Sequence, residues 1–215
     1  MSMIYDPKDE LDHIAEFADS GVRIFQRQGS LVGIPGAYGL KKWLYHKWRN
    51  RGNAVYTFVG SLVAIGLSGL WAYIVKQPLL FPSLGATAFL IFETPMAEVG
   101  TPRNTIIGHS VGVAAGLTSL AIFGLLGAPS VYVSGVTLGR VAAIALAVAL
   151  TGGILRLVRS AHPPAGATTI IVASGLLAKP RQILDILIGV LLLTIAGWCL
   201  NRLMGVPAPA WAAPK

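Results

Sequence analysis

Two histidines lie in or beside long apolar stretches of this sequence, where an ionisable side chain is costly and therefore indicates function. His109 falls within an apolar stretch, and His162 directly precedes two prolines. For His109, a neutral ring bonded to a backbone carbonyl is an equal alternative to a functional role. For His162 we expect anion binding, proton transfer or helix capping. Arg159, three residues before His162, either adds positive charge there or extends its guanidinium to the membrane surface.

Two short segments share the pattern Pro-x-x-Gly-Ala-Thr, beginning at Pro82 and Pro163. Proline suits the first turn of a helix and forces the preceding residue to be extended. Each segment therefore predicts an extended stretch followed by a short helix, whose free N–H groups and partial positive charge attract anions. The alternative is that these prolines only kink ordinary helices. Besides the two histidines and Arg159, the predicted substrate-binding residues are Pro82, Ser83, Gly85, Thr87, Pro163, Pro164, Gly166, Thr168 and Thr169.

The small residues of these segments, Gly85 and Gly166 among them, are expected to allow close approach of neighbouring backbones. A separate series of glycines, at 108, 112 and 116, recurs every four residues on one helix face. Small residues at this spacing favour tight helix packing, and we expect packing within the chain rather than a dimer face.

The chain around these segments is strongly apolar: 54% of its 215 residues are hydrophobic and only 12% are charged. Between residues 53 and 204 the only acidic residues are Glu93, Glu98 and Asp185. This excludes an ordinary soluble domain, which has about 25% charged residues, and predicts a membrane protein. The net charge of +8 does not indicate nucleic-acid binding, because its densest run, residues 41–51, mixes Lys and Arg with Trp and Tyr. That mixture is typical of a cytoplasmic membrane boundary.

Six apolar stretches follow the basic run. Four are long enough for the roughly 20 residues that cross a bilayer, and two, both led by proline, are not. The expected spans are about 55–75, 79–92 (short), 105–126, 136–158, 162–177 (short) and 183–203. The predicted fold class is an all-α membrane protein of two repeated units, each a long helix, a broken or half-helix and a second long helix.

An internal duplication accounts for this order. Shifting the sequence by 81 positions places Pro82, Gly85 and Thr87 on Pro163, Gly166 and Thr168, and aligns the flanking spans. If the short segments cross the membrane, the two units are inverted; if they re-enter, the units are parallel. Basic residues in the loops favour inversion, although Lys76, Lys179 and Arg181 do not fit. Paired proline-interrupted segments of this kind indicate a transport site.

The domain organisation follows from these elements. Residues 1–52 hold an amphipathic helix (8–28), a Gly- and Pro-containing linker and the basic aromatic run; residues 53–127 and 128–204 form the two membrane repeats; residues 205–215 form a short tail. The single cysteine, Cys199, excludes an intramolecular disulfide. No motif for a metal, a nucleotide or a catalytic nucleophile is present, so we expect no enzyme activity, no cofactor and no metal.

The stretch 160–169, Ser-Ala-His-Pro-Pro-Ala-Gly-Ala-Thr-Thr, resembles the signature of the HPP family of integral membrane proteins, which is named for the tripeptide matched here by His162, Pro163 and Pro164. Residues 81–87 are similar to the same family, and the resemblance extends over about residues 50–204. It implies four transmembrane helices and, as in plant plastid and cyanobacterial members, nitrite transport. Some bacterial members add a C-terminal CBS domain; because this chain ends at Lys215, we expect none here.

We therefore expect a transporter or channel for a small inorganic anion, with nitrite first among the candidates. A transporter of another small solute or a cation, and a membrane scaffold subunit, are the alternatives. The expected partners are the lipid bilayer and the anion, with no nucleic acid, and a homo-oligomer is compatible with the sequence. The expected location is the bacterial inner membrane, with both termini in the cytoplasm.

Overall fold

The computed structural model describes residues 39–48, 50–77 and 80–213, and this part of the chain is helical with no strand. The expected amphipathic helix at 8–28 and nearly all of the linker lie outside the described residues. The helices are α2 (Gly39–Trp48), α3 (Asn50–Val75), α4 (Pro82–Glu93), the 3-10 helix η1 (Glu98–Gly100), α5 (Pro102–Ile122), α6 (Val131–Ser134), α7 (Leu138–Leu157), α8 (Pro164–Ala173) and α9 (Pro180–Leu203).

Four of these helices, α3, α5, α7 and α9, are long and apolar enough to cross a membrane, as the hydropathy of the sequence predicts. The helices α4 and α8 have 12 and 10 residues. At about 1.5 Å per residue they are roughly 15–18 Å long, about half of a hydrocarbon core. Both begin at a proline, so the prediction of short proline-led helices is confirmed. Helix α5 ends at Ile122, before the expected 126, because Gly124 turns the chain with a φ of 64°.

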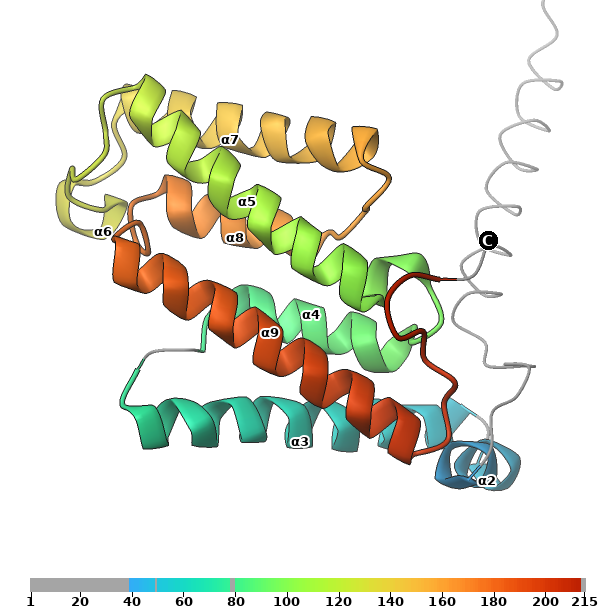
Figure 1. Cartoon of the computed structure of the whole chain (residues 1–215). Coiled ribbons are helices and arrows are strands. Elements are labelled where there is room, and N and C mark those ends of the chain that lie inside the picture. Colours follow the sequence, from blue (N-terminus) through green and yellow to red (C-terminus); the bar gives the residue numbers. More distant parts are fainter. Residues whose placement is uncertain (1–38, 49, 78–79, 214–215) are drawn as a thin grey trace, which may run out of the picture.

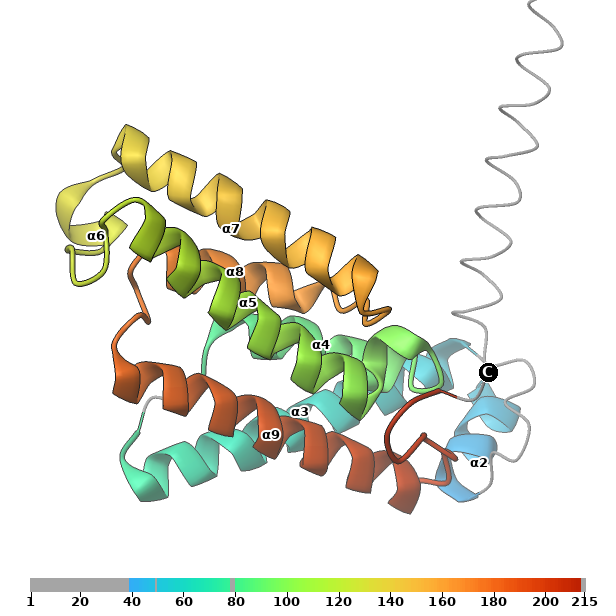
Figure 2. The same ribbon diagram turned by 45° about the horizontal axis from the view of Figure 1, so that its top comes forward.

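The six main helices alternate in direction along the chain, which the two views in Figures 1 and 2 show alike. Helices α3, α5 and α8 run one way, and α4, α7 and α9 run the other way. Because α3 and α5 both start at the end of the bundle near α2, the segment between them passes from one end to the other. This order is the one that inverted units require, while re-entrant segments would start α5 at the opposite end. The duplication itself stays a prediction.

The glycines at 108, 112 and 116 pack α5 against α8 within the chain. A Cβ built on Gly116 would lie 2.8 Å from Val172 on α8. The same relation recurs 81 positions away: a Cβ on Gly197 of α9 would lie 2.7 Å from Ile91 on α4. Each short helix is thus held at van der Waals distance by a glycine of the other predicted unit.

Gly85 and Gly166 do not serve this purpose, contrary to expectation. No atom lies within 4 Å of the position that a Cβ would take at either residue. The close contacts come from glycines of the long helices instead, because the short helices turn their larger side chains toward those helices.

Helix α2 carries part of the basic aromatic run. Trp43 and Trp48 are exposed, with the Lys47 ammonium over both rings, as expected of a membrane boundary. Lys41 is an exception to this picture, because its side chain is buried and its ammonium lies 3.4 Å from the ring centre of Tyr56. Burial lowers the pKa of Lys41 to about 7.

Candidate functional site

Five polar side chains meet in the interior of the bundle, and we call them the histidine cluster. They come from α4, α5, α8 and the segment before α8, and each is at most 2% exposed: Ser83, Thr87, His109, His162 and Thr168. The imidazole rings of His109 and His162 are T-shaped, with 4.9 Å between their centres. Buried polar groups of this kind are stable only where each finds a hydrogen-bond partner.

The paired threonines of the two proline-led segments lie on opposite sides of His109. Thr87 Oγ1 is 3.0 Å from Nε2 of His109, and Thr168 Oγ1 is 2.7 Å from its Nδ1. A hydrogen bond of 2.8 Å between Ser83 and Thr168 joins the first turn of α4 to α8. The two half-helices therefore meet near their N-terminal turns, and His109 lies between their equivalent threonines.

Hydrogen bonding fixes the tautomer of His162. Its Nδ1 lies 2.8 Å from the carbonyl oxygen of Val99, so Nδ1 carries the proton and donates it. In the neutral ring Nε2 is then an acceptor. Thr87 already donates its hydroxyl proton to the carbonyl of Ser83 at 2.9 Å. The donor to His162 is therefore His109 Nε2–H, at 3.2 Å, and the same N–H also faces Thr87 Oγ1 as an acceptor at 3.0 Å.

The opposite tautomer follows for His109. Because Nε2 donates, Nδ1 accepts, and its partner Thr168 donates a hydroxyl proton at 2.7 Å. Thr168 in turn accepts from the hydroxyl of Ser83 at 2.8 Å. The result is a chain of hydrogen bonds in one direction, from Ser83 to Thr168, to His109, to His162 and to the carbonyl of Val99. All ring nitrogens are satisfied with both histidines neutral.

The remaining predicted site residues lie around this cluster rather than in it. Thr169 bonds Thr151 of α7 at 2.8 Å, and so braces α8. Pro82, Pro163 and Pro164 begin the short helices. The Arg159 side chain is exposed and is not among the hydrogen-bond partners of either histidine.

Asn104 is a site residue that the sequence reasoning missed. Its side chain is buried, donates to the carbonyl of Ala161 at 3.2 Å and accepts from Ser160 Oγ at 3.1 Å. It therefore holds the two residues that precede His162. Its place one helical turn before Gly108, which packs against the His162 ring, is the pattern that points to it.

Arg140 also has a role that the sequence did not show. Its position near the start of a long apolar span is typical of a topology marker. The structure buries its guanidinium, which donates to the carbonyls of Ala173 and Pro129 at 3.2 and 2.8 Å. Arg140 thus caps the C-terminus of α8.

A basic cavity of about 920 Å³, which we call the arginine vestibule, opens at the end of the bundle that holds α2 and the C-terminal tail. Its walls are Glu98, Thr101, Arg103, Asn104, Leu155, Arg156, Val158, Arg159, Ala161, Ala212 and Ala213. Arg103 donates to the carbonyls of Val158 and Arg159 at the end of α7. Arg159 has a φ of 50°, a conformation that favours glycine. Two wall residues of the vestibule, Glu98 and Ala161, directly precede Val99 and His162 in the sequence. The vestibule wall is therefore continuous along the chain with the groups that hold the His162 ring.

A second groove of about 920 Å³ lies at the opposite end of the bundle, between the loops that follow α5 and α8. Lys179 is the charged residue in its wall, beside Ser130 and Gln182. The histidine cluster therefore lies between two openings.

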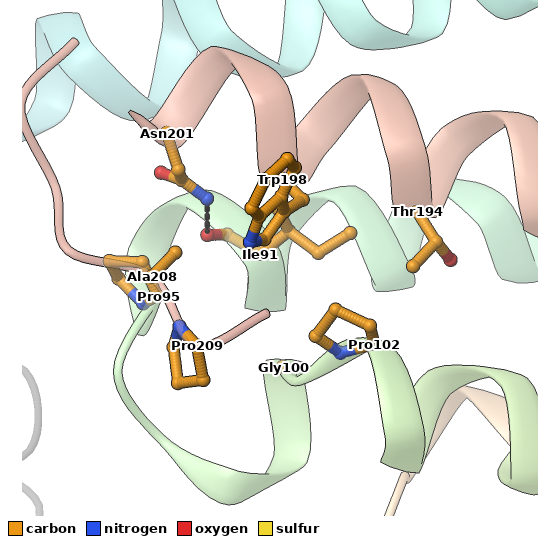
Figure 3. A pocket seen from close by; sticks show the side chains of 9 residues that line it. All are labelled: Ile91, Pro95, Gly100, Pro102, Thr194, Trp198, Asn201, Ala208 and Pro209. Carbon is orange, nitrogen blue, oxygen red and sulfur yellow. Dashed lines mark hydrogen bonds between the residues drawn. The ribbon is translucent and has the colours of Figure 1, made fainter. Parts of the chain in front are cut away.

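Figure 3 shows a third cavity, beneath the C-terminal tail between α4 and α9. At about 10 Å³ it has room for about one water molecule. The Asn201 amide donates to the carbonyl of Ile91 at 2.9 Å on its wall, and Tyr56 donates to the Asn201 oxygen. The Trp198 indole N–H, also on the wall, has no protein partner. This site suits a structural water rather than a substrate.

Comparison with known proteins places this architecture in a family. The profile of the HPP transmembrane region matches residues 47–209, which include all the elements of the site. The chain belongs to the HPP family. In this chain, the tripeptide His162–Pro164 puts a buried imidazole into the bundle and starts the second short helix.

Two relatives of this HPP protein are proteins of Dictyostelium discoideum named only as transmembrane proteins. The first is 28% identical over 150 residues, which are 68% of this chain and 49% of the relative. The second is 33% identical over 117 residues, 54% of this chain and 34% of the relative. The chain thus spans half or less of these relatives' length. No solved structure matches.

Proposed function

We propose that this HPP protein transports a small inorganic anion through the histidine cluster, with nitrite as the first candidate substrate. The observation that carries the proposal is the meeting of two half-helices at a buried polar centre between two openings. Discontinuous helices that meet in the middle of the bundle hold substrates in many transporters. The cluster is closed in this structure, so passage requires it to open toward one end at a time.

The charges near the cluster favour an anion. The cluster itself offers imidazole and hydroxyl donors and no carboxylate. The opening next to His162, the arginine vestibule, contains three arginines against one acid, Glu98. Clefts lined by one sign of charge concentrate the opposite ion. Helix N-terminal turns add partial positive charge, and a planar ion the size of nitrite can accept hydrogen bonds from several of these donors.

We also propose that the vestibule faces the cytoplasm. It shares its end of the bundle with α2, whose lysines and tryptophans suit a cytoplasmic boundary. Under this orientation both the described N-terminal helix and the C-terminal tail are cytoplasmic. The bacterial inner membrane stays the predicted location.

Transport of a cation or neutral solute is the second candidate, supported by the carbonyl oxygens that face the cluster. The carbonyls of Ser83 and Val99 each accept a hydrogen bond there. Both are occupied by donors of the cluster itself, which leaves them less able to coordinate a cation.

Nitrite uptake by liposomes containing the purified chain tests the proposal. We expect uptake well above that of protein-free liposomes, loss of most of it in His162→Ala, and normal uptake in the control His46→Gln, whose side chain is exposed on α2. Uptake no faster than in protein-free liposomes, with no change on altering His162, would contradict the proposal.

A further inference from the structure

The Nε2 atoms of the two imidazoles lie 3.2 Å apart, and no carboxylate in the described part of the chain bonds either ring. We propose that the His109–His162 pair carries one proton with each transported anion, so that the protein is a proton–anion symporter. The inference rests on the proposed transport function and names its coupling ion.

The geometry gives the proton a defined path. A proton that binds His109 at Nδ1 makes an imidazolium whose two N–H groups donate to Thr168, at 2.7 Å, and to His162 Nε2, at 3.2 Å. The Nε2 proton can then pass to His162. His109 is left neutral with its proton on Nδ1, and His162 becomes the imidazolium, bonded to His109 and to the carbonyl of Val99. Only N–H bonds break and form in this transfer between the rings, and the Thr168 hydroxyl, which donates to Nδ1 in the neutral state, turns to accept from the new N–H.

The two ends of this path point toward the two openings. Ser83 and Thr168 lie on the His109 side, and Ser83 is in the first turn of α4, the end of that helix that faces the groove end of the bundle. On the other side, His162 and Val99 adjoin two residues that line the arginine vestibule. The shift of the proton from His109 to His162 therefore moves the charge toward the vestibule.

A charged imidazole in this position needs a counter-ion. The charged side chains on the helices around the pair are Glu93 on α4, Glu98 on η1, Arg103 on α5, Arg140 and Arg156 on α7, and Arg181, Asp185 and Arg202 on α9, with Arg159 in the segment before α8; α8 has none. Among the described residues, none of these bonds either imidazole. An uncompensated buried charge is strongly unfavourable. The transported anion supplies the missing negative charge, and the proton offsets the cost of burying the anion.

Anion accumulation under a pH gradient tests this coupling in liposomes whose membrane potential is clamped to zero. With an alkaline interior, the wild-type chain should concentrate nitrate about tenfold for each pH unit of gradient at equilibrium. His109→Gln keeps one donor and one acceptor but cannot titrate. It should lose the accumulation driven by the pH gradient, whereas His46→Gln should behave as wild type. Accumulation by His109→Gln equal to wild type, or no accumulation by the wild type under the pH gradient, would overturn the proposal.

Histidine-selective nitrogen NMR of the full chain gives a readout that does not depend on transport. At neutral pH without added anion we expect His162 protonated at Nδ1 and His109 at Nε2. Acid titration in nitrite should add one proton to the pair at a higher pH than titration in an equal concentration of sodium gluconate. Identical titrations would overturn the coupling even if anion flux is found. If the titrations differ but no flux exists, the transport function fails and the proton-linked anion site remains.

Discussion

Thr168 is the residue on which the cluster most depends, since its hydroxyl both accepts from Ser83 and donates to His109. Thr168→Val keeps the shape but leaves two buried polar groups without partners, which costs about 1–3 kcal/mol. We expect a lower unfolding temperature in detergent and impaired transport. Thr118→Val, on the exposed face of α5, is the matched control and should change neither. Equal effects of the two variants would show that the Thr168 hydroxyl is not required.

Lys41 gives the protein a pH dependence of a definite sign. Burial lowers its pKa from 10.5 to about 7, so above pH 7 the folded chain releases a proton that the unfolded chain keeps until about 10.5. Because the unfolded state then binds more protons, stability rises with pH across this window. The rise in unfolding temperature from about pH 7 to about pH 9 should shrink in Lys41→Met but not in Lys42→Met, whose side chain is exposed. An unchanged pH response in Lys41→Met would refute this assignment.

At the residue scale, the sequence identified the chemistry of the cluster but not its contacts. His109, His162, Thr87, Thr168 and Ser83 were all candidates, because each is polar in an apolar setting or belongs to a proline-led segment. Their partners are as many as 85 positions apart, and no local pattern shows which groups meet at that separation. The role of His109 between the two threonines needed the fold.

Among the helices, the contact of α5 with α8 is the most sensitive to side-chain size. A Cβ at Gly112 would lie 2.8 Å from the Ala165 carbonyl oxygen and 2.8 Å from Thr169 Oγ1. Since the carbonyl is backbone, the helices must separate, at a cost of about 1–3 kcal/mol. Gly112→Ala should lower the unfolding temperature, while Gly152→Ala, with no atom within 4 Å, should not. A destabilisation of the same size in both variants would contradict a packing cost specific to Gly112, because Gly→Ala inside a helix is otherwise stabilising.

The extents of the helices could be predicted well because hydropathy and proline position determine them. The choice of packing partners could not. The three glycines of α5 were expected to pack within the chain, and they do, against α8. The glycines of the short segments were expected to pack closely and do not, since the spacing of small residues along one helix does not reveal which helix lies opposite.

At the scale of the whole molecule, the alternating helix directions predict which loops share a membrane face. In a chain with Cys199→Ala, a cysteine placed at Ala128 should react only from the face opposite α2, and one at Ala212 only from the face that holds α2. Re-entrant segments would put both positions on the same face. Labelling of both cysteines by a membrane-impermeant reagent from one side would therefore contradict the arrangement seen in Figure 1.

The sequence left inversion and re-entry open because charge in the loops was the only signal that separated them. Arg103, Arg156 and Arg159 do lie at the end of the bundle with α2. Lys76, Lys179 and Arg140 lie at the other end. Arg140 caps α8 there, so its position is no guide to orientation. A buried structural arginine cannot be told from a topology marker without its contacts.

Counterflow of labelled nitrite in liposomes tests the central claim most directly, because it detects substrate exchange whatever ion is coupled to it. Liposomes loaded with unlabelled nitrite should take up external label transiently when the wild-type chain is present. Loading with another small anion such as nitrate should drive some uptake, and loading with sodium gluconate or glycerol should drive none. His162→Ala should abolish the exchange. Label uptake driven equally well by glycerol, or none in the wild type under any loading, would contradict anion transport through the histidine cluster.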